Sequence, residues 1–205
     1  MKEYKIVKKE YGENVWNGIE KADVDTFKWM NNGYAPKVCA MLFHDNKNIY
    51  IKFEVCENSV TVKHFNMQEA VYRDSCVEFF FKTPEKDGYF NIETNAAGAM
   101  LLGFGDGRDG RTYCSDLDFS VFDIKASISD PEKFSGPCWS LEYKIPFSFI
   151  KEHLPGFDIK NGICANIYKC GDETEFEHYG MWNEVINDTP DFHRPEFFGR
   201  MYFEL

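Results

Sequence analysis

The sequence has no run of about 20 apolar residues, the length that a helix needs to cross a bilayer. The opening stretch, MKEYKIVKKEYGEN, holds no apolar segment long enough for a secretory signal. The seven cysteines form no CxxC pair, which argues against zinc-ribbon and thioredoxin-like motifs. Most of them lie in apolar, strand-like runs, where a free thiol behaves as a small buried hydrophobe. We therefore expect a cytoplasmic protein with seven free cysteines, or a secreted one if a signal was removed.

Positive charge is also scarce, because 23 basic residues face 34 acidic ones and the net charge is −11. An acidic surface repels the phosphate backbone of nucleic acids and the anionic surface of membranes. The sequence also lacks a Gly-Lys-Ser/Thr phosphate loop and a Gly-x-Ser-x-Gly nucleophile elbow. We therefore expect neither nucleic acid nor membrane as a partner, and neutral sugars or cations remain.

Apolar residues recur mainly with a period of two, which is typical of β-strands. Ile49–Cys56 alternates clearly and follows Val38–Phe43 across a polar turn, so the pair predicts a hairpin. A second hairpin is predicted from Ser75–Lys82 and Tyr89–Asn95, joined by the turn Thr83–Gly88 with its Asp-Gly signal. Further strands are predicted at Ala99–Phe104, Val121–Ile128, Cys138–Ile145, Gly162–Lys169, His178–Trp182 and Gly199–Leu205.

Only one stretch, Phe147–Leu154 between two prolines, predicts a helix, and a short one. The sequence holds no repeat, linker or low-complexity tract, and a chain of 205 residues suits one all-β domain. We predict a single domain over residues 1–205 with an all-β fold. It is expected to be an antiparallel, jelly-roll-like β-sandwich with one short helix.

The second hairpin places polar side chains on one strand face. Asn91 and Glu93 share that face, and we expect both to point outward into water beside an aromatic ledge. If Lys82 pairs with Tyr89 across the turn, Glu78 lies directly opposite Glu93. Opposed like charges are destabilising, so this register requires a cation, an arginine or protonation of one carboxylate. A shift of one residue would separate the two carboxylates.

The segment Thr189–Gly199 contains two prolines together with three phenylalanines, a histidine and an arginine. Proline stiffens a loop and lowers the entropy that the loop loses when it holds a ligand. The alternative is a structural lid in which Phe197 and Phe198 fill the sandwich.

Four segments together resemble carbohydrate-binding modules of family 9. Val71–Phe80 resembles the family's W-x-x-D-S-V-E-I-F signature, and Phe90–Asn95 is similar to the strand that follows it. Phe192–Phe203 resembles the closing W-R-x-P-x-x-F-G-x-L element, and Tyr179–Asn183 resembles the preceding S-W stretch. The order and spacing match over roughly residues 15 to 205.

This resemblance implies a jelly-roll-like sandwich with a slot in which two aromatic rings hold a sugar, together with structural calcium ions. One ring position falls on Tyr72 and the other near His193 with Phe192 adjacent, where the family usually has tryptophan. Asn91 and Glu93 fall on the family's polar ligand positions. The implied function is non-catalytic binding of a mono- or oligosaccharide, in polysaccharide catabolism and beside a glycoside hydrolase.

The predicted site combines stacking rings with polar side chains and needs no cofactor other than calcium. The candidate ligand-binding residues are Tyr72, Arg73, Asn91, Glu93, Asn95, Trp182, Phe192, His193 and Arg194. Weaker candidates for a metal are Asp74, Glu78, Asp106 and Asp109.

Two other classes of function stay open. A glycoside hydrolase could use Glu78 and Glu93, or Asp74 with either, as paired carboxylates. A haem or redox sandwich is the second alternative, although no spacing singles out a ligand pair among the seven methionines and five histidines.

Overall fold

The computed structural model describes residues 1–85, 88–114, 116–131 and 133–205. Strands dominate this part of the chain, with one α-helix and four short 3-10 turns. In chain order the elements are β1 (Glu3–Lys8), β2 (Ala22–Asp23), β3 (Thr26–Phe27), β4 (Lys37–His44), β5 (Asn48–Cys56), η1 (Val71–Arg73), β6 (Cys76–Lys82), β7 (Tyr89–Asn95), β8 (Met100–Gly105), β9 (Arg111–Tyr113), η2 (Phe119–Phe122), β10 (Lys125–Ala126), β11 (Cys138–Pro146), α1 (Phe147–His153), η3 (Ile159–Asn161), β12 (Ile163–Cys170), β13 (Tyr179–Met181), η4 (Pro195–Phe197) and β14 (Gly199–Phe203).

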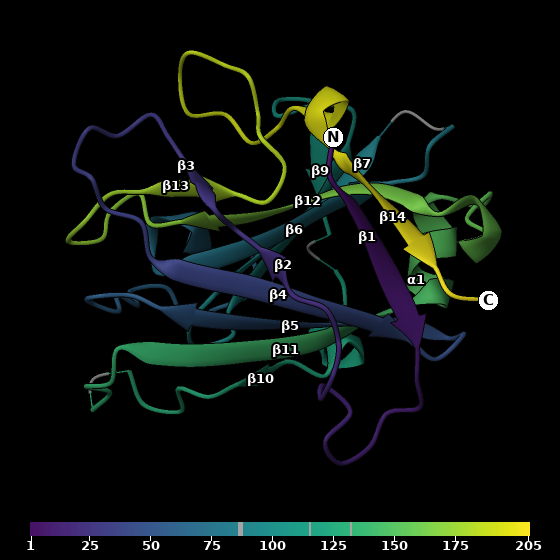
Figure 1. Cartoon of the computed structure of the whole chain (residues 1–205), viewed down its shortest axis with the longest axis horizontal. Helices are drawn as coiled ribbons and strands as arrows, with labels where there is room; N and C mark the ends of the chain where they lie inside the picture. Colours follow the sequence, from purple (N-terminus) through teal and green to yellow (C-terminus); the bar gives the residue numbers. More distant parts are fainter. Residues whose placement is uncertain (86–87, 115, 132) are drawn as a thin grey trace.

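The strands form one curled sheet whose order is β10-β11-β5-β4-β1-β14-β12-β6-β7-β8-β9. Most neighbours are antiparallel, but β1 runs parallel to β14 along its first half and parallel to β4 at its end. Figure 1 shows β1 and β14 side by side, where they join the two halves of the sandwich. The predicted antiparallel β-sandwich with one short helix is confirmed, and the pairings of β1 are the exception.

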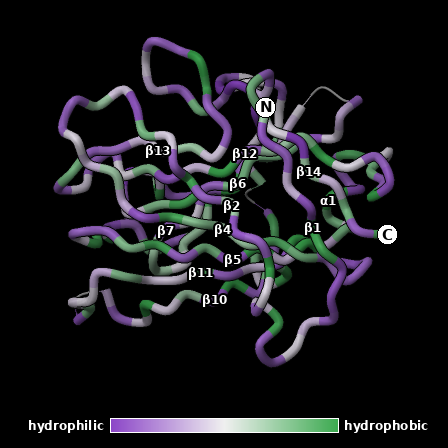
Figure 2. Tube along the Cα trace, in the orientation of Figure 1, coloured by the Kyte–Doolittle hydropathy of each residue, from purple (hydrophilic) through white to green (hydrophobic). Residues whose placement is uncertain are grey.

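The main core lies between the two halves of the sheet. In β5 the residues Ile49, Ile51, Phe53 and Val55 are buried and their neighbours in between are half-buried, as the alternating sequence predicts. Strand β7 differs because all its side chains are buried, which means that loops cover its second face. Figure 2 shows hydrophilic residues concentrated in the peripheral loops around this core.

Most predicted strands occur with ends shifted by one or two residues. The predicted strand Val121–Ile128 is wrong, since the chain there forms the end of η2 and only the short β10. Strands β1, β2, β3 and β9 were not predicted. Three of them span only two or three residues, and β1, although its buried Tyr4 and Ile6 alternate with exposed residues, pairs only with strands distant in sequence. The predicted turn Thr83–Gly88 includes residues 86 and 87, which lie outside the described residues.

The prediction of seven free cysteines is wrong, because Cys56 and Cys138 form a disulfide between β5 and β11. The free cysteines are Cys39, Cys76, Cys114, Cys164 and Cys170. Since disulfides are typical of oxidising compartments, the thiol argument for a cytoplasmic location no longer holds. In the described part of the chain, no helix is both long and apolar enough to span a bilayer.

Candidate functional site

A cavity of about 340 Å³ opens on the second face of the half-sheet formed by β6, β7 and β12. Its floor comes from these strands, and three loops around residues 108, 172 and 191 build its walls. The lining residues are Tyr72, Glu78, Glu93, Arg108, Asp109, Arg111, Tyr113, Cys170, Asp172, Tyr179, Pro190, Asp191, Phe192 and His193. Apart from its rings, this lining is mainly polar and charged.

Two carboxyl groups share the floor of the cavity. Glu78 on β6 is the register partner of Glu93 on β7, and each residue is only 3% exposed. Cys170 Sγ donates to Glu78 Oε1 at 3.0 Å, and Asn91 Nδ2 donates to Glu93 Oε1 at 2.9 Å. Among the described residues neither carboxyl group has an ion-pair partner. The sequence-based register that opposes the two glutamates is thus confirmed.

Burial controls the protonation of this pair. It raises the pKa of Glu78 well above its ordinary range, and the nearby charge of Glu93 raises it further. Burial also raises the pKa of Glu93 to about 7, against the opposing effects of Arg111 and Asn91. At neutral pH the pair therefore retains at least one proton, so the floor offers both a hydrogen-bond donor and acceptors.

A second polar group forms one wall of the cavity. Arg111 Nη1 lies 2.6 Å from His193 Nε2, and the Tyr89 hydroxyl lies 2.7 Å from His193 Nδ1. Burial, followed by the charge of Arg111, lowers the pKa of His193 to about 3, so the imidazole is neutral. Arg111 Nε is buried without a hydrogen-bond partner in the described structure. The wall thus presents a guanidinium with an unused donor.

The rim is held by backbone contacts between the loop after β12 and the turn η1. Asp172 N donates to the carbonyl of Tyr72 at 3.3 Å, and Glu173 N donates to that of Arg73 at 3.0 Å. Burial raises the pKa of Asp172 to about 6. The half-buried residues Tyr72 and Asp172 both line the cavity.

The structure brings part of the predicted site together. Tyr72, Glu93, Phe192 and His193 from the ligand-binding set line the cavity, and so do Glu78 and Asp109 from the metal candidates. The alternative of a structural lid agrees with Phe198, which is buried in the second apolar cluster, and with Phe197, which is half-buried against it. Phe192 packs there as well, because its ring stacks on Tyr168 with centroids 4.1 Å apart. Arg73, Asn91, Asn95, Trp182, Arg194, Asp74 and Asp106 do not line the cavity.

The prediction that Asn91 and Glu93 face water is wrong. Both side chains point to the face opposite the main core, but Asn91 is fully buried and Glu93 nearly so. The chain between β12 and β14 covers this face and packs Phe192 and Phe198 against it. The alternation of β7 indicated the correct face, whereas the cover comes from a segment distant in sequence.

Other predicted residues make structural contacts. Asn95 Nδ2 donates to Asp74 Oδ2 at 2.9 Å and to the carbonyl of His64 at 2.7 Å, which ties a loop to the end of β7. Trp182 packs in the main core. Asn95 and Trp182 therefore lie in segments that resemble the family but contribute to the structure and not to the cavity lining.

Three charged residues of the predicted site, Arg73, Arg194 and Asp106, lie outside the cavity. Arg73 lies 3.4 Å from Glu173 in an exposed ion pair, and Arg194 Nε pairs with Asp191 Oδ2 at 3.1 Å. Asp106 is exposed outside the cavity. The expected calcium ion stays a prediction.

Sequence reasoning missed eight lining residues: Arg108, Arg111, Tyr113, Cys170, Asp172, Tyr179, Pro190 and Asp191. Arg111 ends the charged Gly-rich loop that carries Asp106 and Asp109, so charge in that loop was the available signal. Cys170 reaches the cavity because β12 pairs with β6, and Asp172 because the loop after β12 contacts η1. Both contacts are long-range, and no local pattern encodes them.

The comparisons with known proteins identify the family and the fold. The sequence model of carbohydrate-binding family 9 matches residues 14–203. A solved structure from Bacteroides uniformis, a "putative carbohydrate-binding protein", is 28% identical with a TM-score of 0.84, covering 98% of this chain and 99% of that one. A family 9 module from Caldicellulosiruptor kristjanssonii in complex with glucose is 13% identical with a TM-score of 0.62, covering 99% and 96%. The cellotriose complex of a family 9 module from the same organism gives 12% identity and a TM-score of 0.60, covering 99% and 94%. No curated protein matches the chain.

Proposed function

Because the chain belongs to carbohydrate-binding family 9, we propose that its cavity binds the end of a carbohydrate without cleaving it. The volume of about 340 Å³ lies near the lower end for ligand pockets, roughly 300–1,000 Å³, which suits one or two sugar units. The glucose and cellotriose bound by the related modules make these two sugars the first probes.

One observation carries this proposal: a closed polar floor faces an aromatic rim across an open space. The Tyr72 ring offers an apolar face for the C–H groups of a sugar. Glu78 and Glu93 can accept from sugar hydroxyls, and the Arg111 guanidinium lines the same space. Since no described lysine or arginine forms an ion pair with either carboxyl group, sugar hydroxyls can supply hydrogen bonds to them.

Titration calorimetry with glucose and cellotriose tests the proposal. We expect dissociation constants between about 1 mM and 1 µM, because few groups are engaged. Tyr72→Ala should weaken binding by about tenfold or more, since it removes the stacking ring. Tyr202→Ala is the matched control, because that tyrosine is 44% exposed on β14 and does not line the cavity.

Equal losses in the two tyrosine variants would contradict a site at Tyr72. If neither sugar binds, a glycan array with the wild-type protein extends the search to other neutral sugars. Absence of binding across the array would overturn the proposal and leave the family fold alone.

Glu78 and Glu93 also permit the paired-carboxylate chemistry of a glycoside hydrolase. We expect no turnover of chromogenic glycosides, in keeping with membership of a binding family. Turnover by the wild type that disappears in Glu78→Gln would instead assign catalysis to this pair.

The proposal includes an accessory role in polysaccharide breakdown. A module that binds a sugar end can hold a glycoside hydrolase near its substrate by raising the local concentration. Pull-down of a hydrolase together with its polysaccharide, dependent on Tyr72, would test this role.

A further inference from the structure

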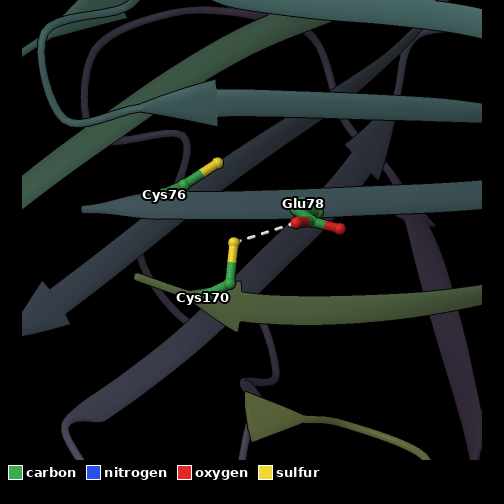
Figure 3. Close-up of side chains that lie close together, drawn as sticks. All are labelled: Cys76, Glu78 and Cys170. Atoms are coloured by element: carbon green, nitrogen blue, oxygen red, sulfur yellow. Dashed lines mark hydrogen bonds between the residues drawn. The ribbon is translucent and has the colours of Figure 1, made fainter. Parts of the chain in front are cut away.

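At the cavity floor, two thiols and a carboxyl group lie within reach of a single ion. Cys76 and Glu78 come from β6, and Cys170 comes from the neighbouring β12 (Figure 3). One ligand atom from each residue lies within 4.8 Å of the other two. Cys76 and Cys170 are register partners, and the hydrogen bond from Cys170 to Glu78 connects the strands. In the described ranges this is the only group of three such side chains this close together.

We infer that Cys76, Cys170 and Glu78 form a binding site for a thiophilic divalent cation of the Zn²⁺ class. Two sulfur atoms and one carboxylate oxygen supply three of the four positions of a tetrahedral zinc site. In a tetrahedral zinc site with Zn–S bonds of about 2.3 Å, the two sulfur atoms lie roughly 3.7 Å apart. The two sulfur atoms here lie within 4.8 Å of each other, so a side-chain movement of about 1 Å would bring them to that separation. Thiolate ligands select zinc over calcium, which prefers oxygen.

The charges of the floor provide an independent argument for a cation. Glu78 faces Glu93 directly, and among the described residues no lysine or arginine forms an ion pair with either. Without a cation the pair can be buried only by retaining a proton, whereas a divalent ion would allow Glu78 to bind it as a carboxylate and would balance the charge of the two thiolates. Elsewhere in this fold the buried Glu57 does have its own cation, Lys169.

Access and coordination both point toward the cavity. Cys170 and Glu78 line it, whereas Cys76, two residues before Glu78 on the same strand, is fully buried and does not. An ion entering from the cavity would bind these three residues and keep its fourth position open toward the same space. Water or a ligand oxygen could occupy that position.

Binding should release protons. Burial raises the pKa of Cys76 to about 11, and it raises those of Cys170 and Glu78 well above their ordinary ranges. A metal requires the thiolate and carboxylate forms, so its affinity should rise with pH.

Titration with Co²⁺, which gives thiolate-to-metal absorption bands, tests the site without any sugar. The protein is kept under nitrogen without reductant, so that the Cys56–Cys138 disulfide stays closed. We expect one equivalent of Co²⁺ to give these bands and Zn²⁺ to displace it. Cys170→Ser and Cys76→Ser should lose the bands, and Glu78→Gln should weaken binding by about tenfold or more. Cys114→Ser is the matched control, because Cys114 is a half-buried free thiol outside the cluster.

Alkylation mapped by mass spectrometry gives a second readout on the unaltered chain, in case a variant fails to fold. Zn²⁺ should slow iodoacetamide labelling of Cys170 and leave that of Cys114 unchanged. Bands that persist in Cys170→Ser, equal protection of both thiols, or isolation of Cys76 joined to Cys170 as a disulfide would overturn the inference. None of these results depends on whether the cavity binds sugar.

Discussion

Buried carboxyl groups lie on both faces of β12, but only the one on the core face has a cationic partner among the described residues. On one face Lys169 Nζ forms an ion pair with Glu57 Oε2 at 3.1 Å, although this contact lacks hydrogen-bond geometry. Trp139 Nε1 donates a hydrogen bond to the other carboxylate oxygen, Glu57 Oε1, at 2.6 Å. On the other face the next residue, Cys170, contacts Glu78, which has only another carboxyl group opposite.

The difference lies in whether the chain supplies the counter-charge. Lys169 is fully buried and also lies 2.9 Å from His178 Nε2, whose pKa falls to about 3 mainly through burial. Lys169 and Trp139, the partners of Glu57 in the described structure, are both buried, and Glu57 itself does not line the cavity. Glu78 and Glu93 instead face a cavity. A buried carboxyl group alone is thus poor evidence of a binding site. A buried carboxyl group that lacks a cationic partner and also lines a cavity is better evidence.

The strongest way to break this comparison is to remove the lysine. Lys169→Met should leave Glu57 charged and unpaired, and this should lower the free energy of unfolding by about 3–5 kcal/mol. Urea unfolding at neutral pH measures the loss. The double variant with Glu57→Met should recover much of it, because an apolar pair replaces the ion pair. A loss below about 1 kcal/mol in the single variant would mean that water already solvates Glu57.

A smaller effect, of opposite sign, is expected from Glu93→Gln. The pKa of Glu93 is raised from 4.5 to about 7 in the folded protein, so the folded state holds more protons than the unfolded state between these values. The stability that Glu93 contributes is therefore present at low pH and is lost as pH rises through this window. Glutamine avoids the loss and keeps an oxygen for Asn91 Nδ2.

The measurement is the difference between Glu93→Gln and wild type in urea unfolding at several pH values, which cancels groups common to both. It should be near zero around pH 4 and favour the variant by about 1–3 kcal/mol above pH 7. A difference that does not change with pH would show that folding leaves the pKa of Glu93 unshifted.

The smallest effect is expected at Arg73, a charge that belongs to neither buried cluster. Its ion pair with Glu173 is about half exposed, so Arg73→Ala should change the free energy of unfolding by less than about 1 kcal/mol. Because Arg73 does not line the cavity, its removal should also leave sugar affinity within about twofold. A tenfold loss of sugar affinity in calorimetry would instead show that Arg73 contributes to sugar binding, as the sequence predicted.

The local part of this architecture was predictable from sequence. Alternation in Ile49–Cys56 gave the buried face of β5, and the assumed pairing of Lys82 with Tyr89 placed Glu78 opposite Glu93. The prolines around Phe147–Leu154 limited α1 to two turns. In each case the decisive information lies within about 20 residues of chain.

The remainder depends on contacts between distant segments. Cys56 meets Cys138 only because β11 pairs with β5 in one register, and no Cys spacing encodes that pairing. Asn91 lost its expected exposure because the segment ending at Phe198 folds over β7. The motif positions at Asn95 and Trp182 matched the family pattern, yet their side chains make structural contacts.

The seam between β1 and β14 has a consequence for biosynthesis. Glu3 pairs with Arg200 and Ile6 with Phe203. During translation β1 is therefore synthesised almost 200 residues before β14, the strand with which it pairs. Until then β1 offers an unpaired edge, which is open to pairing with other chains. Slow translation or a late truncation before β14 should therefore favour aggregation of nascent chains over closure of the sandwich.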